Sequence, residues 1–239
     1  MTTILQPIDI YTFGPAWGIP VPTCTPFGLK VLTWMRLRDL PYRIRVENDP
    51  SKGPKGKCPW AVVGGEMVPD SEHIITAIKR EHGVPGDELG AERQAIATAT
   101  RLMLEDHYHQ IWEHELFVYE GGWKEGFKFF DSFPPGVRVL IRTLARRALR
   151  KQLIARGMGR HSHEQIVQMG VTVLDAVDEL LGDDPYFFGE EPFEIDACVF
   201  AFMALTKWIP VDSEVWEHFH GLPRLGRYCE RMLARCFSS

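Results

Sequence analysis

Residues 23–27 are Thr-Cys-Thr-Pro-Phe, and they stand where an early apolar strand, residues 8–13, gives way to an amphipathic helix. Hydroxyl and thiol groups at such a junction lie beside the N–H groups and dipole of a helix N-terminus, which favour a bound anion. Further along, residues 56–59 are Gly-Lys-Cys-Pro, with the proline entering a strand, and Asp70-Ser71 begins another helix. The three segments together predict one small-molecule pocket.

The first 83 residues alternate between strand and helix patterns. Short apolar segments are bounded by Gly and Pro, and Gly64-Gly65 is typical of a hairpin turn. The expected strands are residues 8–13, 42–46, 60–63 and 67–68, and the expected helices begin at Thr23 or Thr25 and at Asp70 or Ser71. The order β-α-β followed by β-β-α predicts a mixed sheet whose second half is antiparallel.

Residues 83–88 are Gly-Val-Pro-Gly-Asp-Glu, which predicts a linker. The sequence that follows has helical periodicity to its end. The expected helices are residues 91 to about 120, Pro134-Pro135 to about 156, a capping-box helix from Ser162 and Gln165 to about 181, residues 195–207, and residues 222 to about 237. We therefore predict an α/β domain at residues 1–83 and an all-α domain at residues 89–239.

The net charge, the apolar runs and the cysteines of the sequence argue against several classes of protein. A net charge of -5 and a pI near 6.0 argue against a nucleic-acid-binding protein. Residues 197–205 form the longest apolar run, which is too short to cross a membrane, and residues 1–10 lack the pattern of a secretory signal. The five cysteines are odd in number and form no C-x-x-C pair, so we expect free thiols and a cytoplasmic location.

The element order resembles the cytosolic glutathione transferases, in which a thioredoxin-like domain precedes an all-helical one. Within that superfamily, six segments look similar to the failed-axon-connections and metaxin-like branch. They are residues 11–13 (YTF), 25–30 (TPFGLK), 40–42 (LPY), 56–60 (GKCPW), 157–162 (GMGRHS) and 228–231 (YCER). The resemblance implies a soluble protein that binds glutathione. It leaves the assembly open between a homodimer, a weak dimer and another interface.

The resemblance also assigns a glutathione site. Cys58, before an expected cis proline at Pro59, would bond the tripeptide backbone through its own main chain, and Lys57 would face the glycine carboxylate. Asp70 and Ser71 match the acid-serine pair that receives the γ-glutamyl end. No metal is implied, and glutathione is the only co-substrate expected.

Thr25 matches the residue that meets the glutathione sulfur, because it precedes Pro-Phe at the first helix. A hydroxyl hydrogen bond and a helix N-terminus would both favour the thiolate. The plainer alternative is that Thr25 only caps its helix. Cys24 is a second candidate, since a thiolate there could form a mixed disulfide with glutathione. A further alternative is a regulatory disulfide between Cys24 and Cys58.

Aromatic side chains suggest where an apolar or aromatic acceptor would bind. Trp17 lies in the long loop before the first helix, and Tyr108 and Trp112 lie four residues apart on the long helix expected to face the interdomain cleft. Simple packing is the alternative for this pair. His109 and Glu113 share a helix face as a metal pair would, but no third ligand has the required spacing.

Four arginines, Arg138, Arg142, Arg146 and Arg150, recur every four residues and predict a basic helix face. Such a face suits anionic lipid, nucleic acid or an acidic partner. Two interpretations without a partner are favoured over this one: a solvated face, or ion pairs with acids that follow in the sequence, namely Asp175, Asp178, Glu179, Asp183 and Asp184.

The sequence thus favours an enzyme that presents the glutathione thiolate to a small electrophile. The alternative is a non-catalytic interaction or trafficking protein of the same fold, as in the failed-axon-connections and metaxin-like branch. The long loop at residues 14–22, and Thr25 in place of Ser or Cys, favour this alternative. Phe193 also departs from the superfamily pattern, since Ser or Thr usually stands three residues before the Asp196 position.

Overall fold

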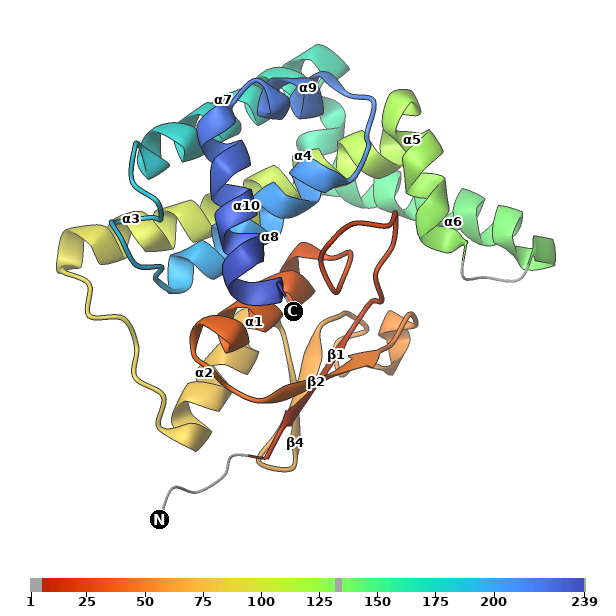
Figure 1. The fold of residues 1–239 in the computed structure, drawn as a ribbon. Coiled ribbons are helices and arrows are strands. Elements are labelled where there is room, and N and C mark those ends of the chain that lie inside the picture. The colour runs from red at the N-terminus through yellow and green to blue at the C-terminus, as the bar shows by residue number, and fades with distance from the viewer. Residues whose placement is uncertain (1–5, 132–134, 239) are drawn as a thin grey trace.

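The computed structural model describes residues 6–131 and 135–238. A four-stranded sheet with two helices forms the N-terminal domain, and helices form the rest of the described chain (Figure 1). The strands are β1 (Ile8–Thr12), β2 (Tyr42–Val46), β3 (Trp60–Val63) and β4 (Glu66–Pro69). Their order is β2-β1-β3-β4, with β1 parallel to β2 and the other two pairs antiparallel. The sequence predicts a mixed sheet of this kind, with an antiparallel second half.

The N-terminal core lies between this sheet and helices α1 (Pro26–Leu37) and α2 (Ser71–His82). Ile10 of β1 and Leu32 of α1 are fully buried there, because the apolar stripe of α1 faces the sheet. Gly28 is required where α1 meets β1, since a Cβ atom at that position would come within 2.1 Å of a threonine hydroxyl on β1. The N-terminal end of α1 is therefore held tightly against the end of β1.

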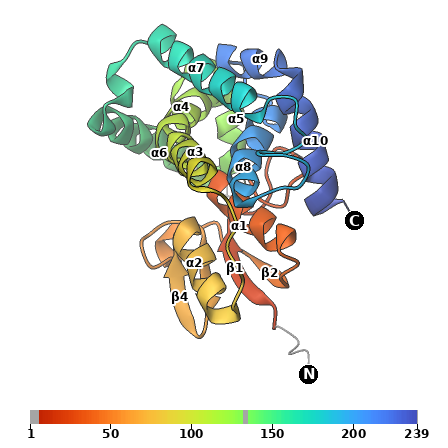
Figure 2. The same ribbon diagram turned by 90° about the vertical axis from the view of Figure 1, so that its left-hand side faces the viewer.

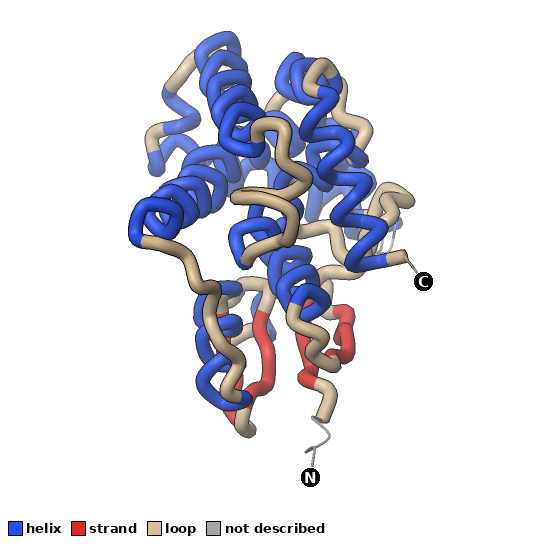
Figure 3. Tube along the Cα trace, turned by 60° about the vertical axis from the view of Figure 1, so that its left-hand side comes forward, coloured by secondary structure: helices blue, strands red, loops and turns tan. Residues whose placement is uncertain are grey.

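The helical domain packs against α1 (Figures 2 and 3). Its helices are α3 (Ala91–Leu102), α4 (His109–Glu113), α5 (Glu120–Gly126), α6 (Pro135–Arg156), α7 (His163–Leu181), α8 (Glu194–Trp208), α9 (Glu214–His220) and α10 (Pro223–Phe237). Helix α8 is apolar on every side and is central, as expected for a helix surrounded by others. Pro134, one of the two expected starts of α6, lies outside the described residues.

The long helix expected from residue 91 is present but irregular. Two π-helical segments, Met103–Tyr108 and His114–Val118, flank α4 on either side. Such segments are rare and frequently lie at functional sites. The short helices α5 and α9 have no clear counterpart in the sequence prediction, because seven residues give too little periodicity to identify a helix.

The basic stripe on α6 is only partly solvated: Arg150 is exposed, whereas Arg142 and Arg146 pair with acids outside α7. Arg142 donates to Asp131 at 2.5 Å and lies over the ring of Phe127. Arg146 donates to Glu120 at 2.8 Å and lies over the ring of Trp123. The stripe therefore faces α5 and the turn after it, because only the tertiary packing decides which of two acidic segments lies beside a basic helix face.

Candidate functional site

The strand register aligns three chain segments at one end of the sheet. Tyr11 of β1 pairs with Trp60 of β3, and Trp60 pairs in turn with Pro69 of β4. The rings of Tyr11 and Trp60 stack with centroids 5.1 Å apart, which fixes this row. The last residue of β1, the residue before β3 and the residue after β4 consequently lie side by side.

Those three residues are Thr12, Pro59 and Asp70. The Asp70 N–H donates to the Pro59 carbonyl at 3.3 Å, and the peptide bond before Pro59 is cis, as predicted. The Asp70 carboxylate is exposed and caps α2, while Ser71, the first residue of that helix, is 2 % exposed. Two of the segments expected to hold glutathione therefore meet at this edge.

Thr25, in the segment before α1, is connected to this edge of the sheet through the hydroxyl of Thr12. The Thr12 hydroxyl contacts the hydroxyl of Thr23 at 3.1 Å and that of Thr25 at 3.5 Å. Thr12 and Thr23 are fully buried, whereas Thr25 is half-buried and its hydroxyl accepts from the Gly28 N–H at 3.3 Å. Thr25 is thus the N-cap of α1 and the member of the cluster that reaches the surface, with a hydroxyl proton to donate. Thr12 has no sequence signal beyond its place at a strand end.

The cysteines beside the site are neutral thiols. Cys24 is 3 % exposed, and burial raises its pKa to about 12. Burial also raises the pKa of Cys58 to about 12, and its thiol lies 3.7 Å from the Glu47 carbonyl. A thiol with this pKa is almost entirely protonated at neutral pH. All five cysteines are free, so the geometry favours Thr25 over Cys24 and does not form the Cys24–Cys58 disulfide.

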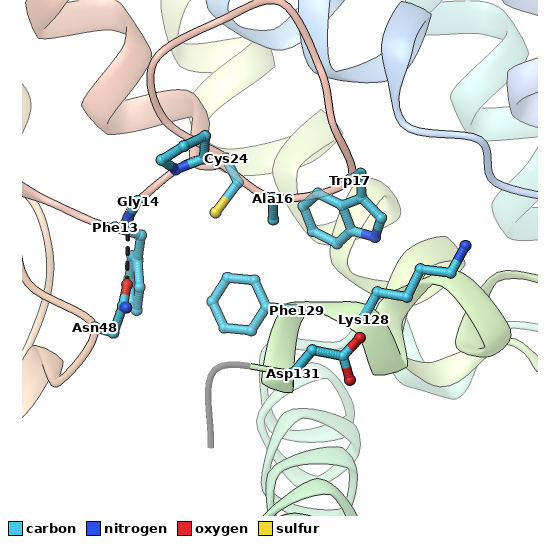
Figure 4. A pocket seen from close by; sticks show the side chains of 10 residues that line it. Phe13, Gly14, Ala16, Trp17, Cys24, Asn48, Lys128, Phe129 and Asp131 are labelled. Carbon is cyan, nitrogen blue, oxygen red and sulfur yellow. Dashed lines mark hydrogen bonds between the residues drawn. The ribbon is translucent and has the colours of Figure 1, made fainter. Parts of the chain in front are cut away.

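A cavity of about 330 Å³ lies beside Cys24, between the long loop and the C-terminal domain (Figure 4). Its lining is Phe13, Gly14, Pro15, Ala16, Trp17, Cys24, Asn48, Lys128, Phe129 and Asp131. The Trp17 indole N–H donates to the Glu125 carbonyl at 2.8 Å, which anchors the loop to α5. Trp17 therefore lines a cavity whose volume lies within the range of small-molecule sites.

Tyr108 and Trp112, the other two expected acceptor residues, lie in the core. Tyr108 is fully buried, and its hydroxyl contacts that of Thr206 at 3.0 Å. Trp112 is 4 % exposed and packs edge-on against Phe117. Simple packing is the correct interpretation of this pair, because the helix turns these two side chains toward α8 and the core rather than toward the cavity that Trp17 lines.

The face of α4 that meets α1 carries a histidine and a carboxylic acid. The His109 ring packs edge-on against the Phe27 ring, with the two ring centroids 4.9 Å apart. The Nε2 atom of His109 lies 3.9 Å from Glu113 Oε1. Burial, with Arg156 and Lys57 nearby, lowers the pKa of His109 to about 3. Burial raises the pKa of Glu113 to about 7 against the opposing effect of Arg156 and Lys57. The described residues contain no cluster of three or more potential metal ligands.

A second cavity, of about 220 Å³, lies between the domains and is polar. Lys30 of α1, although 1 % exposed, forms ion pairs there with Glu72 of α2 and with Glu105 at 2.5 Å. Arg101 completes the network with Glu105 at 2.8 Å. Two cations thus balance two carboxylates. Because Lys30 belongs to the N-terminal domain and Glu105 to the helical domain, the network joins the two domains. The sequence offered no signal for it.

Two family models match the chain, and together they cover more than half of it. The glutathione S-transferase N-terminal domain matches residues 26–122, and the C-terminal domain matches residues 170–232. Across the residues that the structure describes, no helix is long and apolar enough to span a membrane.

Relatives match over nearly all of the chain. Failed axon connections of Drosophila melanogaster is 29% identical over 91% of this chain, which spans 55% of that protein. Metaxin-1 of Bos taurus is 24% identical over 97% of the chain and 75% of the relative. Isoprene-epoxide--glutathione S-transferase of Rhodococcus sp. is 27% identical over 94% of the chain and 97% of the relative.

Solved structures share the fold. A glutathione transferase of Phanerochaete chrysosporium superposes with a TM-score of 0.67 at 17% identity, covering 99% of this chain and 100% of that one. A glutathione transferase family member of Pseudomonas fluorescens with two glutathione bound gives a TM-score of 0.58 at 15% identity, covering 98% and 91%. The two family models show that the chain belongs to the glutathione transferase superfamily, and the solved structures share its fold.

Proposed function

We propose that the protein binds glutathione and transfers its thiolate to a small electrophile. One observation carries the proposal: the strand register brings the end of β1, the cis proline and the start of α2 to one edge of the sheet, beside the N-terminus of α1. The resemblance assigns the N-terminus of α1 to the glutathione sulfur, and the cis proline and the start of α2 to the tripeptide. At the α1 end of this edge lie the hydroxyl groups of Thr12 and Thr25, and at the α2 end lies the exposed carboxylate of Asp70.

Each end of glutathione has a matching group at this edge. The exposed Asp70 carboxylate suits the α-ammonium of the γ-glutamyl end, and Ser71 with the α2 N-terminus suits its α-carboxylate. The backbone of Cys58 would bond the middle of the tripeptide. The exposed Lys57 would face the glycine carboxylate.

Thr25 would stabilise the thiolate. A hydrogen bond from its hydroxyl to a charged sulfur is worth roughly 1.5–3 kcal/mol, or about one to two pKa units. The α1 N-terminus adds up to about 1 kcal/mol. Glutathione held this way would be substantially ionised at neutral pH, and the bound orientation would direct it at the acceptor.

We infer that the acceptor is a small epoxide. The relative from Rhodococcus sp. carries an epoxide in its name and matches nearly the full length of both chains. The aromatic lining of the cavity, with Phe13, Trp17 and Phe129, suits a small and largely apolar molecule. A cavity of about 330 Å³ is at the lower end of the range for small-molecule sites.

Calorimetric titration with glutathione tests the proposal. We expect the wild-type protein to bind, and Ser71→Ala to weaken binding by about five- to a hundred-fold through the loss of one hydrogen bond to a charged group. Thr172→Ala, which removes an exposed hydroxyl from α7, is the matched control and should bind as the wild type does. Absence of binding to the wild type at millimolar glutathione would reject the proposal.

One observation favours a non-catalytic interaction protein instead. Helix α6 exposes a set of apolar side chains, Val137, Val139, Leu140 and Leu144, which are 47–67% exposed. Exposed apolar patches are typical of contact surfaces. The same titration separates the two functions, because a protein that acts only through this surface has no need to bind glutathione.

A further inference from the structure

Three threonine hydroxyls form a chain that runs from the interior of the N-terminal domain to its surface. The hydroxyl oxygen of Thr12, the last residue of β1, lies 3.1 Å from that of Thr23 and 3.5 Å from that of Thr25. Thr12 and Thr23 are fully buried, whereas Thr25 is half-buried. The chain therefore has a buried end at Thr23 and a surface end at Thr25.

The backbone holds the middle of this hydroxyl chain in place. Thr12 pairs with Val46 of β2, and its carbonyl accepts from the Glu47 N–H at 2.9 Å. A Cβ atom at position 28 would come within 2.1 Å of the Thr12 hydroxyl oxygen and 2.9 Å of the Thr25 hydroxyl oxygen, so glycine is needed there to leave room for both. The Thr12 hydroxyl is thus confined between the end of β1 and the first turn of α1.

Burial determines the direction in which this chain donates, because each hydroxyl has a single proton. Among the described residues, the Thr12 side chain hydrogen-bonds to Thr23 and Thr25 alone, and the Thr23 side chain to Thr12 alone. If Thr25 donated to Thr12, then Thr12 or Thr23 would keep a buried proton without an acceptor, which is costly. When Thr23 donates to Thr12 and Thr12 donates to Thr25, both buried protons have an acceptor.

This direction leaves the Thr25 proton to be donated outside the cluster. The Thr25 oxygen accepts from the Gly28 N–H at 3.3 Å and from the Thr12 hydroxyl, which together occupy both of its lone pairs. The Thr12–Thr25 separation of 3.5 Å is long for two hydroxyls. We expect it to shorten when a bound thiolate accepts the Thr25 proton, because a hydroxyl that donates becomes a better acceptor.

We propose, resting on the function proposed above, that Thr12 is a positioning residue for the transfer reaction: its hydroxyl donates to Thr25 and directs the Thr25 proton to the glutathione sulfur. Thr12 is fully buried, so it acts on the sulfur through Thr25 and not by contact. Loss of its hydroxyl should therefore have a smaller effect on the thiolate than loss of the Thr25 hydroxyl.

Thiolate absorbance of bound glutathione, followed against pH, tests the inference. We expect Thr12→Val, which removes the hydroxyl and nearly keeps the shape, to raise the pKa of the bound thiol by about half to one unit. Thr12→Ser keeps the hydroxyl and should give the wild-type curve. Thr33→Val is the matched control and should also leave the curve unchanged. Thr33 is fully buried on α1, and its hydroxyl has no hydrogen-bond partner in the part of the chain that the structure describes.

A second variant tests the direction of donation. In Thr23→Val, Thr12 still donates to Thr25, so the pKa of the bound thiol should stay near its wild-type value. Calorimetry at about pH 5, where the bound thiol is largely protonated, should give the same glutathione Kd for the wild type, Thr12→Val and Thr23→Val. A structural disturbance of β1 would instead weaken binding at this pH.

Four results would overturn the inference alone. They are an unshifted curve in Thr12→Val, a shift that Thr12→Ser or Thr33→Val shares, a shift of equal size in Thr23→Val, and weaker binding by Thr12→Val at about pH 5. Failure of the wild type to bind glutathione, or binding that leaves the pKa of the glutathione thiol unlowered, would overturn the transferase function itself.

Discussion

Two adjacent residues at the start of α1 have opposite environments. Cys24 is almost fully buried against the cavity and holds its proton, while Thr25 reaches the surface and caps the helix. From the sequence, both were candidates for the contact with sulfur, because a helix N-terminus stabilises a thiolate as well as an anionic ligand. Burial argues against Cys24, since desolvation opposes the charged form of its thiol and raises its pKa.

Thr25→Ala should raise the pKa of the bound glutathione thiol by about one to two units, because the donor to the sulfur is removed. Affinity for the tripeptide should change little, since its other contacts lie elsewhere. Thiolate absorbance of bound glutathione followed against pH measures the shift. Thr25→Ser keeps the hydroxyl and Cys24→Ala removes a neutral thiol, so neither should move the curve. A shift in Cys24→Ala with none in Thr25→Ala would assign the role to the cysteine.

At the level of elements, α8 shows how an unusual helix start is stabilised. Phe193, at its N-cap, has no hydroxyl to offer, although the Asp196 carboxylate still accepts from the Phe193 N–H at 2.8 Å. The missing acceptor comes from the linker, where the Asp87 carboxylate accepts from the Glu194 N–H at 2.6 Å and also pairs with Arg38. An acid at a helix N-terminus stabilises both the open N–H groups and the dipole.

Asp87→Ala should therefore lower the free energy of unfolding by about 1–2 kcal/mol, the usual cost of losing a helix cap. Urea denaturation followed by circular dichroism measures it. Glu88→Ala is the control, since this neighbouring acid is exposed and should change stability by less than about 0.5 kcal/mol. Equal effects of the two substitutions would show that Asp87 acts only through its charge in the linker and not as a cap.

At the scale of the molecule, a buried charge network joins the two domains. Lys30 of α1 is almost completely buried between Glu72 of α2 and Glu105 of the helical domain. The Trp34 indole N–H donates to Glu194 at 3.0 Å close by, so α1 is tied to the helical domain by polar as well as apolar contacts. Buried ions are stable only when paired, so the interface requires both domains to be folded.

Lys30→Ala should lower the free energy of unfolding by about 3–5 kcal/mol, because it leaves two carboxylates at the interface without their central cation. Chemical denaturation provides the measurement, and Lys55→Ala, in an exposed loop, is the matched control. A loss below about 1 kcal/mol would mean that water or Arg101 already neutralises the pair.

The sequence by itself determined the order of the elements, most of their boundaries and the proline before β3. These follow from local signals: apolar periodicity sets strands and helices, and Gly, Pro and capping residues set their ends. Strands β2 and β3, the start of α2 and the end of α7 agree with the predicted residues, because each is bounded by a strong turn or cap signal. The apolar run at residues 197–205 is consistent with the central position of α8.

The tertiary structure alone decided which polar groups meet. Lys30 and Glu105 are 75 residues apart and Asp87 and Glu194 are 107 apart, so no local pattern could pair them. The same holds for Glu113, because burial in the packed chain raises its pKa to about 7. Helical spacing placed these side chains on a face, but the free energy of a charge depends on the solvent and partners around it, and only the packed chain supplies those.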